Sequence, residues 1–126
     1  MGLLSKKNKP SQKAYAVVTG AGSGIGRSFA LELTKRGGDV ICADIDLSSA
    51  QETVDLIQSM TSSSAYAVNC DVGLKESVHT LAEQAEQLLG YPVTLLINNA
   101  GVGLGGKFDE VSLEDWQWCM HVNLWG

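Results

Sequence analysis

From Ala14 onward, the hydrophobic and polar residues of the chain form two kinds of segment that follow each other in turn. Short apolar runs are followed by longer segments in which apolar residues recur every three or four positions. The first kind of segment predicts a strand and the second an amphipathic helix. The predicted strands cover Ala14 to Thr19, Val40 to Asp44, Ala65 to Cys70 and Val93 to Asn98. Because these runs are apolar on both faces, we expect a parallel sheet covered by helices on either side, an α/β fold of the Rossmann type.

The helical segments between the strands carry apolar stripes and end signals. The residues expected to face the core in the first three helices are Ile25, Phe29 and Leu33, then Val54 and Ile57, then Val78, Leu81, Ala85 and Leu88. The first helix is predicted to end at Gly37–Gly38, where glycine adopts the left-handed C-cap conformation without strain. Ser48 and Gln51 predict a capping box for the second helix. His79 lies off the stripe of the third helix and is expected to face solvent.

The fourth helix is expected to begin at Ser112, whose hydroxyl would cap it in the pattern Ser112-x-x-Asp115. Its Trp116 and Met120 are expected to point inward. Right-handed crossovers predict a doubly wound sheet with the strand order 3-2-1-4. A nucleotide-binding crevice would then lie at the carboxyl ends of strands one and four, where the order reverses.

Charge divides the chain into a basic arm and an acidic body. The formal net charge of the 126 residues is -5, but the first thirteen residues hold four lysines, Lys6, Lys7, Lys9 and Lys13. The five remaining basic and fourteen acidic residues give the body a charge of -9. We expect residues 1–13 to be a flexible arm and residues 14–126 to be the N-terminal part of a nucleotide-binding domain. An acidic body argues against a nucleic-acid partner.

No targeting, membrane-spanning or metal-binding segment is expected from the sequence. No apolar run approaches the roughly 20 residues of a membrane span, and Lys6 stands where a myristoylation signal needs Ser or Thr. Cys42, Cys70 and Cys119 are widely spaced, and with the two histidines they do not match the spacing of a zinc site. We therefore expect a cytoplasmic protein with reduced, mostly buried thiols, no metal and no membrane partner.

A glycine-rich turn between the first strand and the first helix carries the strongest chemical signal. It reads Thr19-Gly20-Ala21-Gly22-Ser23-Gly24-Ile25-Gly26. Glycines permit a tight turn and let backbone N–H groups approach a pyrophosphate, which the positive end of the helix dipole favours. The spacing is Gly-x-x-x-Gly-x-Gly, and it departs from the general dinucleotide fingerprint because Ile25 follows Gly22 by three positions. A purely structural turn is the alternative for this segment taken alone.

Asp44 ends the second strand, 18 residues after Gly26. A carboxylate at that position can accept hydrogen bonds from the adenosine ribose hydroxyls. It would also repel a 2′-phosphate, which favours NAD over NADP. Arg27 allows the opposite interpretation, as a partner of that phosphate, although an arginine on a helix surface is common. A simple turn residue beside Asp46 is the alternative for Asp44.

The pattern Thr-Gly-x-x-x-Gly-Ile-Gly resembles the short-chain dehydrogenase/reductase family, classical type, and further motifs follow in that family's order. Asn98-Asn99-Ala100-Gly101 is similar to the family's most specific tetrapeptide. The resemblance implies that this segment steadies the central sheet and lines the ribose side of the cofactor. It also implies that Asp71 and Val72 lie beside the adenine ring, although Asp71 could instead cap the third helix.

Asn123 matches the asparagine that in this family interrupts a helix and holds a water of the proton relay, so it is the predicted catalytic residue. Asparagine is otherwise unfavourable within a helix, and a surface asparagine near a frayed end is the alternative. The predicted cofactor-binding residues are Gly20, Ser23, Gly24, Ile25, Gly26, Asp44, Asp71, Val72, Asn99, Ala100 and Gly101.

The resemblance implies an NAD-dependent oxidoreductase of small-molecule alcohol or carbonyl substrates, homo-oligomeric in its full-length form. The family's catalytic Ser and Tyr-x-x-x-Lys are not found, since none of Tyr15, Tyr66 and Tyr91 is followed by a lysine four residues later. We therefore expect this chain to be the cofactor-binding part and to be inactive alone. A catalytically inert nucleotide-binding fragment is the alternative. A methyltransferase that binds S-adenosylmethionine would not explain Asn-Asn-Ala-Gly.

Overall fold

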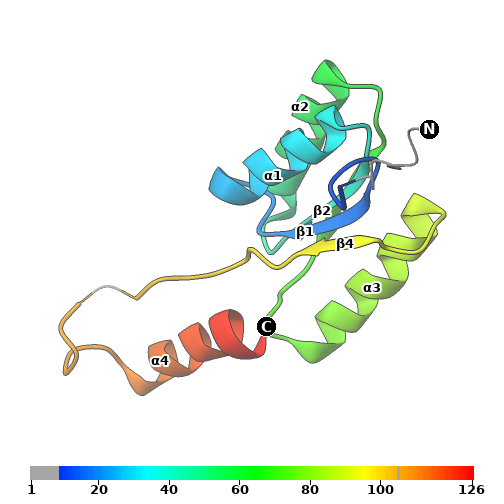
Figure 1. Cartoon of the computed structure of the whole chain (residues 1–126). Helices are drawn as coiled ribbons and strands as arrows, with labels where there is room; N and C mark the ends of the chain where they lie inside the picture. Colours follow the sequence, from blue (N-terminus) through cyan, green and yellow to red (C-terminus); the bar gives the residue numbers. More distant parts are fainter. Residues whose placement is uncertain (1–8, 105) are drawn as a thin grey trace, which may run out of the picture.

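The computed structural model describes residues 9–104 and 106–126. Four strands alternate with helices in an α/β fold (Figure 1). The elements in chain order are β1 (Tyr15–Thr19), α1 (Gly24–Lys35), β2 (Asp39–Asp44), α2 (Leu47–Met60), β3 (Ala65–Asn69), α3 (Lys75–Leu89), β4 (Leu95–Ile97), α4 (Leu113–Met120) and the π-helical turn η1 (His121–Trp125). Most of the predicted basic arm, including Lys6 and Lys7, lies outside the described residues.

The sheet has the order β3-β2-β1-β4, which confirms the prediction. All neighbouring strands are parallel, and Val18 of β1 lies beside Cys42 of β2 on one side and Ile97 of β4 on the other. The crossovers run outward from β1 to β3, and the chain then returns past β1 to form β4. The chain leaves β1 toward one edge of the sheet and leaves β4 toward the other. A crevice therefore opens between the carboxyl ends of these two strands.

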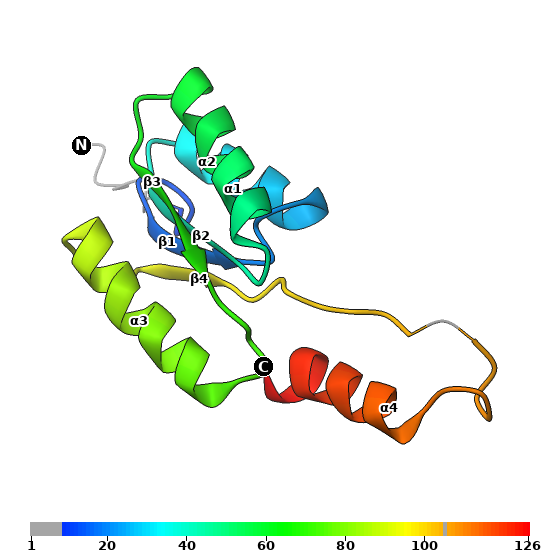
Figure 2. The same ribbon diagram turned by 180° about the vertical axis from the view of Figure 1, so that it is seen from behind.

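The two faces of the sheet carry separate cores. Helices α1 and α2 cover one face and α3 covers the other (Figures 1 and 2). Side chains alternate along each strand, so Val18 and Val40 pack toward α1 and α2, while Val17 and Ile41 pack toward α3. The prediction of helices on both faces is confirmed.

β4 departs most from its predicted bounds, since it holds three residues instead of the six from Val93 to Asn98. After Ile97 the chain turns, and the Asn99 N–H donates to the side-chain hydroxyl of Thr19 rather than to a backbone carbonyl of β1. β4 pairs with β1 alone, and its central Leu96 is exposed. The expectation of a strand buried on both faces is therefore wrong for β4.

The buried stripe of α1 differs from the predicted one. Ile25 and Phe29 are 69% and 41% exposed. The buried residues of the helix are Gly26, Ala30, Leu33 and Thr34. Gly26 determines this face, because a Cβ there would collide with the Gly20 carbonyl oxygen, so the start of the helix packs closely against the turn. The helix ends as predicted, with Gly37 in the left-handed region at φ +82°.

α2 begins two residues earlier than its predicted capping box requires. The N-cap is Asp46, whose carboxylate accepts a hydrogen bond from the Ser49 N–H at 3.2 Å. The box of Ser48 and Gln51 is therefore wrong. Backbone and side-chain hydrogen bonds from Ser49 lower the pKa of the Asp46 carboxyl. The predicted core residues of this helix, Val54 and Ile57, are buried.

α3 buries a narrower stripe than the sequence suggests. Its buried residues are Leu81, Ala85 and Leu89. The predicted core positions Val78 and Leu88 are exposed, because the helix turns Leu89 rather than Leu88 toward the sheet. His79 is exposed, as predicted.

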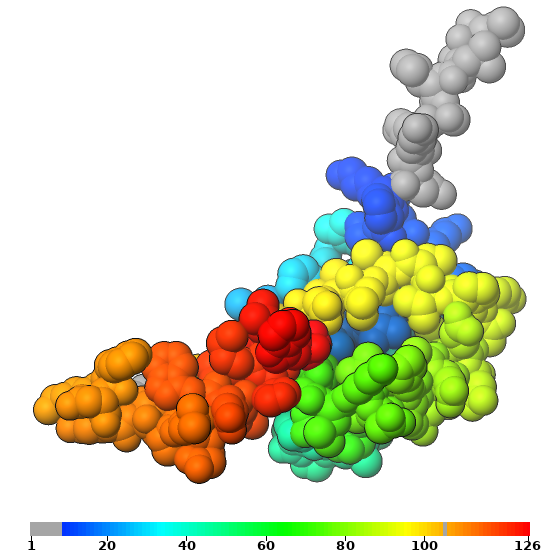
Figure 3. All heavy atoms as spheres, turned by 90° about the horizontal axis from the view of Figure 1, so that it is seen from below, coloured from blue at the N-terminus to red at the C-terminus, as the bar shows by residue number. Residues whose placement is uncertain are grey.

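α4 begins with the predicted cap, in which the Asp115 N–H donates to the Ser112 hydroxyl at 3.1 Å. The expectation that Trp116 and Met120 point inward is wrong, since no residue of α4 is buried. The helix lies away from the sheet, and Figure 3 shows its segment extending from the rest of the molecule. Within the described part of the chain, no helix combines the length and the apolar content needed to cross a membrane.

Candidate functional site

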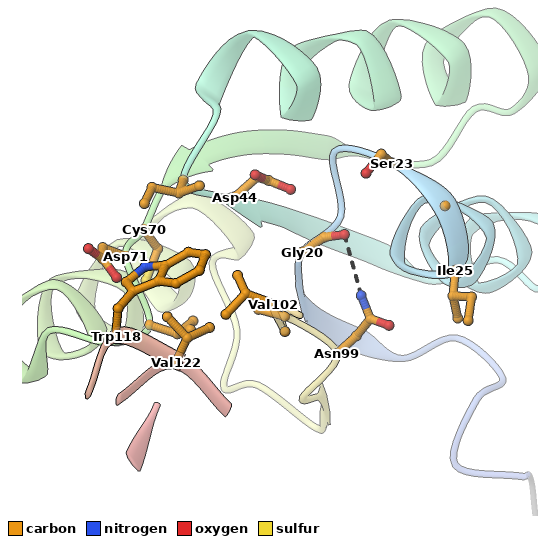
Figure 4. A pocket seen from close by; sticks show the side chains of 15 residues that line it. Gly20, Ser23, Ile25, Asp44, Cys70, Asp71, Asn99, Val102, Trp118 and Val122 are labelled. Carbon is orange, nitrogen blue, oxygen red and sulfur yellow. Dashed lines mark hydrogen bonds between the residues drawn. The ribbon is translucent and has the colours of Figure 1, made fainter. Parts of the chain in front are cut away.

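A cavity of about 420 Å³ opens at the carboxyl ends of the strands. Its walls come from the turn after β1, the ends of β2 and β3, the segment after β4, and α4 with η1 (Figure 4). All of the predicted cofactor-binding residues except Gly26 line it. They are joined by Ile45, Cys70, Val102, Trp118 and Val122. Residues far apart in the sequence therefore share one concave surface.

Three glycines of the turn are required for different reasons. Gly20 has φ +64°, and a Cβ there would lie 2.9 Å from the Asn99 side-chain nitrogen. Gly24 has φ +54° and open space around it, so a side chain would be strained by its backbone and would project into the space beside the turn. Gly26 is buried beneath the turn, which explains why it packs the helix without lining the cavity.

The N-terminus of α1 faces the cavity, and no side chain of its own first turn caps it or neutralises its positive potential. Its N-cap Ser23 makes no side-chain capping hydrogen bond, and its first turn holds no acidic residue. The first N–H groups of a helix lack intrahelical acceptors, and the helix dipole adds positive potential there. With Ser23, Gly24 and Ile25 all on the lining, this end of α1 can accept an anion such as a pyrophosphate.

Asp44 braces the turn from the end of β2. Its Oδ2 accepts from the Gly22 N–H at 2.8 Å, and its Oδ1 accepts from the Asp46 N–H at 3.0 Å. Each carboxylate oxygen can accept more than one hydrogen bond, so the half-buried side chain can still accept from ligand hydroxyls. The carboxylate thus supports the loop and supplies negative charge to the cavity. The lining contains Asp44 and Asp71 and no basic residue among those described.

Arg27 does not line the cavity. Its guanidinium instead contacts the Thr53 hydroxyl, the Gly22 carbonyl and the Glu52 carboxylate. The interpretation of Arg27 as a partner of a 2′-phosphate is therefore not supported by its position. Sequence reasoning missed Thr53, a buried polar residue whose only local signal is a threonine within an otherwise apolar helix face.

Asn99 and Thr19 lock β4 to the glycine turn. The Asn99 side-chain nitrogen donates to the carbonyls of Thr19 and Gly20 at 3.1 and 3.4 Å, the second of which is drawn in Figure 4. The buried Thr19 hydroxyl accepts from the N–H groups of Asn99 and Ala100 at 3.1 and 3.0 Å. The Asn-Asn-Ala-Gly segment therefore crosses the carboxyl ends of the central strands in a defined position.

Asp71, Val72 and Trp118 form a wall of the cavity opposite the glycine turn. Asp71 accepts a hydrogen bond from the Gly73 N–H at 2.9 Å, and the N-cap of α3 is Leu74, so the alternative of Asp71 as that cap is wrong. Figure 4 shows the Trp118 indole beside Asp71. An aromatic face and apolar side chains at this position suit a flat ring. The sequence did not indicate Trp118, because the face that α4 turns toward the cavity was predicted incorrectly.

Asn123 lies in η1, where the regular helix gives way to a π-helical turn. Its Oδ1 accepts from the Val102 N–H at 2.8 Å, and its Nδ2 donates to the Val102 carbonyl at 2.7 Å. It lines a cavity of about 100 Å³ next to the main one, together with Ala100. The side chain therefore holds the backbone segment that follows Gly101. Its role in a proton relay stays a prediction.

The cysteines form neither a metal site nor a disulfide. Among the described residues, no cluster of three or more His, Cys, Asp or Glu side chains could hold a metal ion. Cys42 and Cys70 are buried and Cys119 is half-buried, and all three are unpaired. Burial raises the pKa of Cys42 to about 12 and also raises the pKa of Cys70. Both buried thiols are thus protonated at neutral pH, including Cys70 at the cavity wall.

The sequence profile of the family described as short chain dehydrogenase matches residues 14–126. This chain belongs to that family. Human epidermal retinol dehydrogenase 2 is 33% identical over 98% of the chain, and retinol dehydrogenase 10-A of Xenopus laevis is 34% identical over 96%. The chain spans 41% and 42% of the lengths of these two curated relatives, so it corresponds to the N-terminal part of a short-chain dehydrogenase.

Solved structures of short-chain dehydrogenases and other proteins share this fold. A short-chain dehydrogenase/reductase from Burkholderia phymatum in complex with NAD superposes with a TM-score of 0.84 at 38% identity, covering 92% of this chain and 41% of that one. A blue fluorescent protein from a metagenomic library, in complex with NADPH, gives 0.81 at 32% identity, covering 92% and 47%. The relatives therefore include proteins that hold either dinucleotide.

Proposed function

We propose that residues 14–126 form the NAD-binding part of an oxidoreductase that acts on alcohol or carbonyl substrates. The observation that carries the proposal is the position of Asp44 on the same cavity as the N-terminus of α1. One group suits ribose hydroxyls and the other suits a pyrophosphate, and these are the two polar parts of an adenine dinucleotide. The cytoplasmic location and the homo-oligomeric full-length form expected from the sequence stay predictions.

The lining residues divide among the parts of the dinucleotide. The glycine turn would hold the pyrophosphate, Asp44 the adenosine ribose, and Asp71 with Val72 the adenine ring. The segment from Asn99 to Gly101 would border the nicotinamide ribose. Bound NAD would accept a hydride from an alcohol, or NADH would give one to a carbonyl. The chain's own residues bind and orient the cofactor for that transfer, and the names of the two retinol dehydrogenases support an alcohol or carbonyl substrate.

The charges of the cavity favour NAD over NADP. A 2′-phosphate placed at Asp44 would meet one carboxylate directly and a second at Asp71, with no described basic side chain on the lining to compensate. Like charges in a partly buried site repel strongly. The proposal of NAD thus rests on the residues of this cavity and not on the relatives.

Calorimetric titration of NAD and NADP into the chain tests the proposed function. We expect NAD to bind more tightly, and Asp44→Ala to weaken NAD roughly tenfold or more while it improves NADP binding, because both ribose acceptors and a repelling charge are removed. The matched control is Asp39→Ala at the opposite end of β2, where a half-buried carboxylate also accepts a backbone hydrogen bond, from Ser64 at 2.8 Å.

The gain in NADP affinity is a result that loss of folding cannot imitate. A chain that binds neither dinucleotide, although its thermal melt shows a folded protein, would refute the proposal. Equal effects of Asp39→Ala and Asp44→Ala on the ratio of the two affinities would refute the assignment of Asp44.

A further inference from the structure

Two side chains from neighbouring helices hold the outer side of the glycine turn. Arg27 of α1 donates through Nε to the Thr53 hydroxyl of α2 at 2.9 Å and through Nη2 to the Gly22 carbonyl at 2.5 Å. Thr53 donates its own proton to the Ala21 carbonyl at 2.7 Å. Thr53 is fully buried, so water cannot easily replace its partners. We call Arg27 and Thr53 the crossbrace, because they join both helices to the turn.

The crossbrace determines the direction of two backbone N–H groups. In a trans peptide the C=O and the N–H point in opposite directions, and the described residues contain no cis peptide. Holding the Ala21 carbonyl against Thr53 turns the Gly22 N–H the other way, where it donates to Asp44 Oδ2 at 2.8 Å. Holding the Gly22 carbonyl against Arg27 turns the Ser23 N–H away from Arg27. Ser23 itself lies on the cavity lining.

We infer, building on the proposed NAD-binding function, that Arg27 and Thr53 are positioning residues: they keep the Gly22 amide on the Asp44 carboxylate and orient the Ser23 amide for the cofactor. Arg27 acts through the backbone and not as an anion ligand, because its guanidinium lies outside the cavity lining. Its charge is also paired with Glu52 at 3.2 Å. Cofactor affinity therefore depends on Thr53 in α2, a helix that contributes no residue to the cavity lining.

Conservative substitutions separate positioning from charge. Arg27→Lys keeps the positive charge, but an ammonium group cannot reproduce the fixed fork by which guanidinium holds a hydroxyl and a carbonyl together. Thr53→Val keeps the shape of the buried side chain and removes its donor, which leaves the Ala21 carbonyl unsatisfied. Thr53→Ser keeps the hydroxyl. Arg36→Lys is the matched control, since Arg36 is the C-cap of α1, at the end of the helix far from the turn, and it also has an acidic partner, Glu32 at 2.8 Å.

The experiment titrates NAD and NADP into the 126-residue chain and these variants, with amide hydrogen exchange of the turn measured in parallel. We expect Thr53→Val, Arg27→Lys and Arg27→Met each to weaken NAD about tenfold. Thr53→Ser and Arg36→Lys should stay within about twofold of the parent chain. The Gly22 and Ser23 amides should exchange faster in the three weakened variants. In these variants the carbonyl of the same peptide group, that of Ala21 or Gly22, is no longer held by a hydrogen bond.

Three results would overturn the inference. The first is an Arg27→Lys variant that binds NAD as tightly as the parent chain. The second is an Arg27→Met variant that loses affinity for NADP alone. Either result would mean that Arg27 acts as an anion ligand. The third is Thr53→Val with unchanged amide exchange and unchanged NAD affinity. If the parent chain binds neither dinucleotide, the proposed function fails, and exchange at Gly22 and Ser23 in Thr53→Val against Thr53→Ser alone decides the crossbrace.

Discussion

Two regions of the chain differ in whether their apolar side chains are buried. In the strand–helix region, residues 9–97, strands and helices bury each other on both faces of the sheet. In the terminal region, residues 98–126, none of the described residues is buried. Leu124 and Trp125 are 60% and 74% exposed, although a core would readily accept both. Similar side chains therefore form a core in one region and a surface in the other.

The difference shows what a periodic apolar pattern predicts. α3 and α4 both carry apolar residues at helical spacing, but only α3 lies against a sheet. The pattern indicates which side chains favour burial and does not indicate the surface that covers them. In the terminal region, Trp116, Trp118 and Met120 are exposed along α4 beside the apolar residues of η1. They form an exposed apolar surface.

The largest expected effect comes from adding one methyl group in each region. A Cβ at Gly26 would collide with the Gly20 carbonyl oxygen and with the Asn99 side chain, whereas a Cβ at Gly103 would meet nothing within 4 Å. We expect Gly26→Ala to lower the free energy of unfolding by more than about 4 kcal/mol, because the backbone at the contact cannot move aside. Gly103→Ala should change it by less than about 0.5 kcal/mol.

Urea unfolding of both variants measures this contrast. If Gly26→Ala were as stable as Gly103→Ala, α1 would not be packed as closely on the turn as the structure shows.

Shortening an aliphatic side chain should give a smaller contrast of the same sign. Ile41 is fully buried in β2, while Leu124 of η1 is mostly exposed. We expect Ile41→Ala to cost about 3 kcal/mol of unfolding free energy, from lost burial and the cavity that remains. Leu124→Ala should cost less than about 0.5 kcal/mol. Comparable losses in thermal melts would mean that Leu124 is covered in solution, and a dependence on protein concentration would identify self-association as the cause.

The order of the sheet and the members of the cavity could be predicted because each depends on local chemistry. Continuous apolar runs favour doubly covered strands, and right-handed crossovers leave few topologies. The motifs after β1, β2, β3 and β4 all lie at strand ends, so a parallel sheet must bring them to one edge. Prediction was accurate where each residue's environment follows from its neighbours in sequence.

The remaining features depend on which residue faces which neighbour. The stripe through Ile25 and Phe29 was wrong because close packing of Gly26 rotates α1, and no apolar count reveals a backbone contact. Trp118 was missed because α4 was expected to pack Trp116 inward. The contacts of Arg27 with Thr53 join residues 26 positions apart, and a helix-surface arginine looks the same in sequence whether it is solvated or bonded.

The smallest expected effect concerns how the two regions cap their helices. α2 is capped by the Asp46 carboxylate, whereas α4 is capped by the uncharged Ser112 hydroxyl. Hydrogen bonds from Ser49 lower the pKa of Asp46 in the folded chain. A carboxyl whose folded pKa lies below its unfolded value, about 3.9, stabilises the fold above that pH and loses this contribution as the pH falls through the folded pKa. The start of α2 should therefore be sensitive to acid.

Asp46→Asn tests this difference, because asparagine keeps an oxygen that accepts from the Ser49 N–H but does not titrate. We expect the parent chain to lose slightly more stability than Asp46→Asn between pH 6 and roughly pH 3, a window set by the lowered pKa and the unfolded value near 3.9. Urea unfolding at the two pH values measures the difference. Asp55→Asn, a change of an exposed acid within the same helix, is the control for general charge effects. Identical pH dependence in Asp46→Asn and the parent chain would show that the Asp46 cap does not couple folding to protonation.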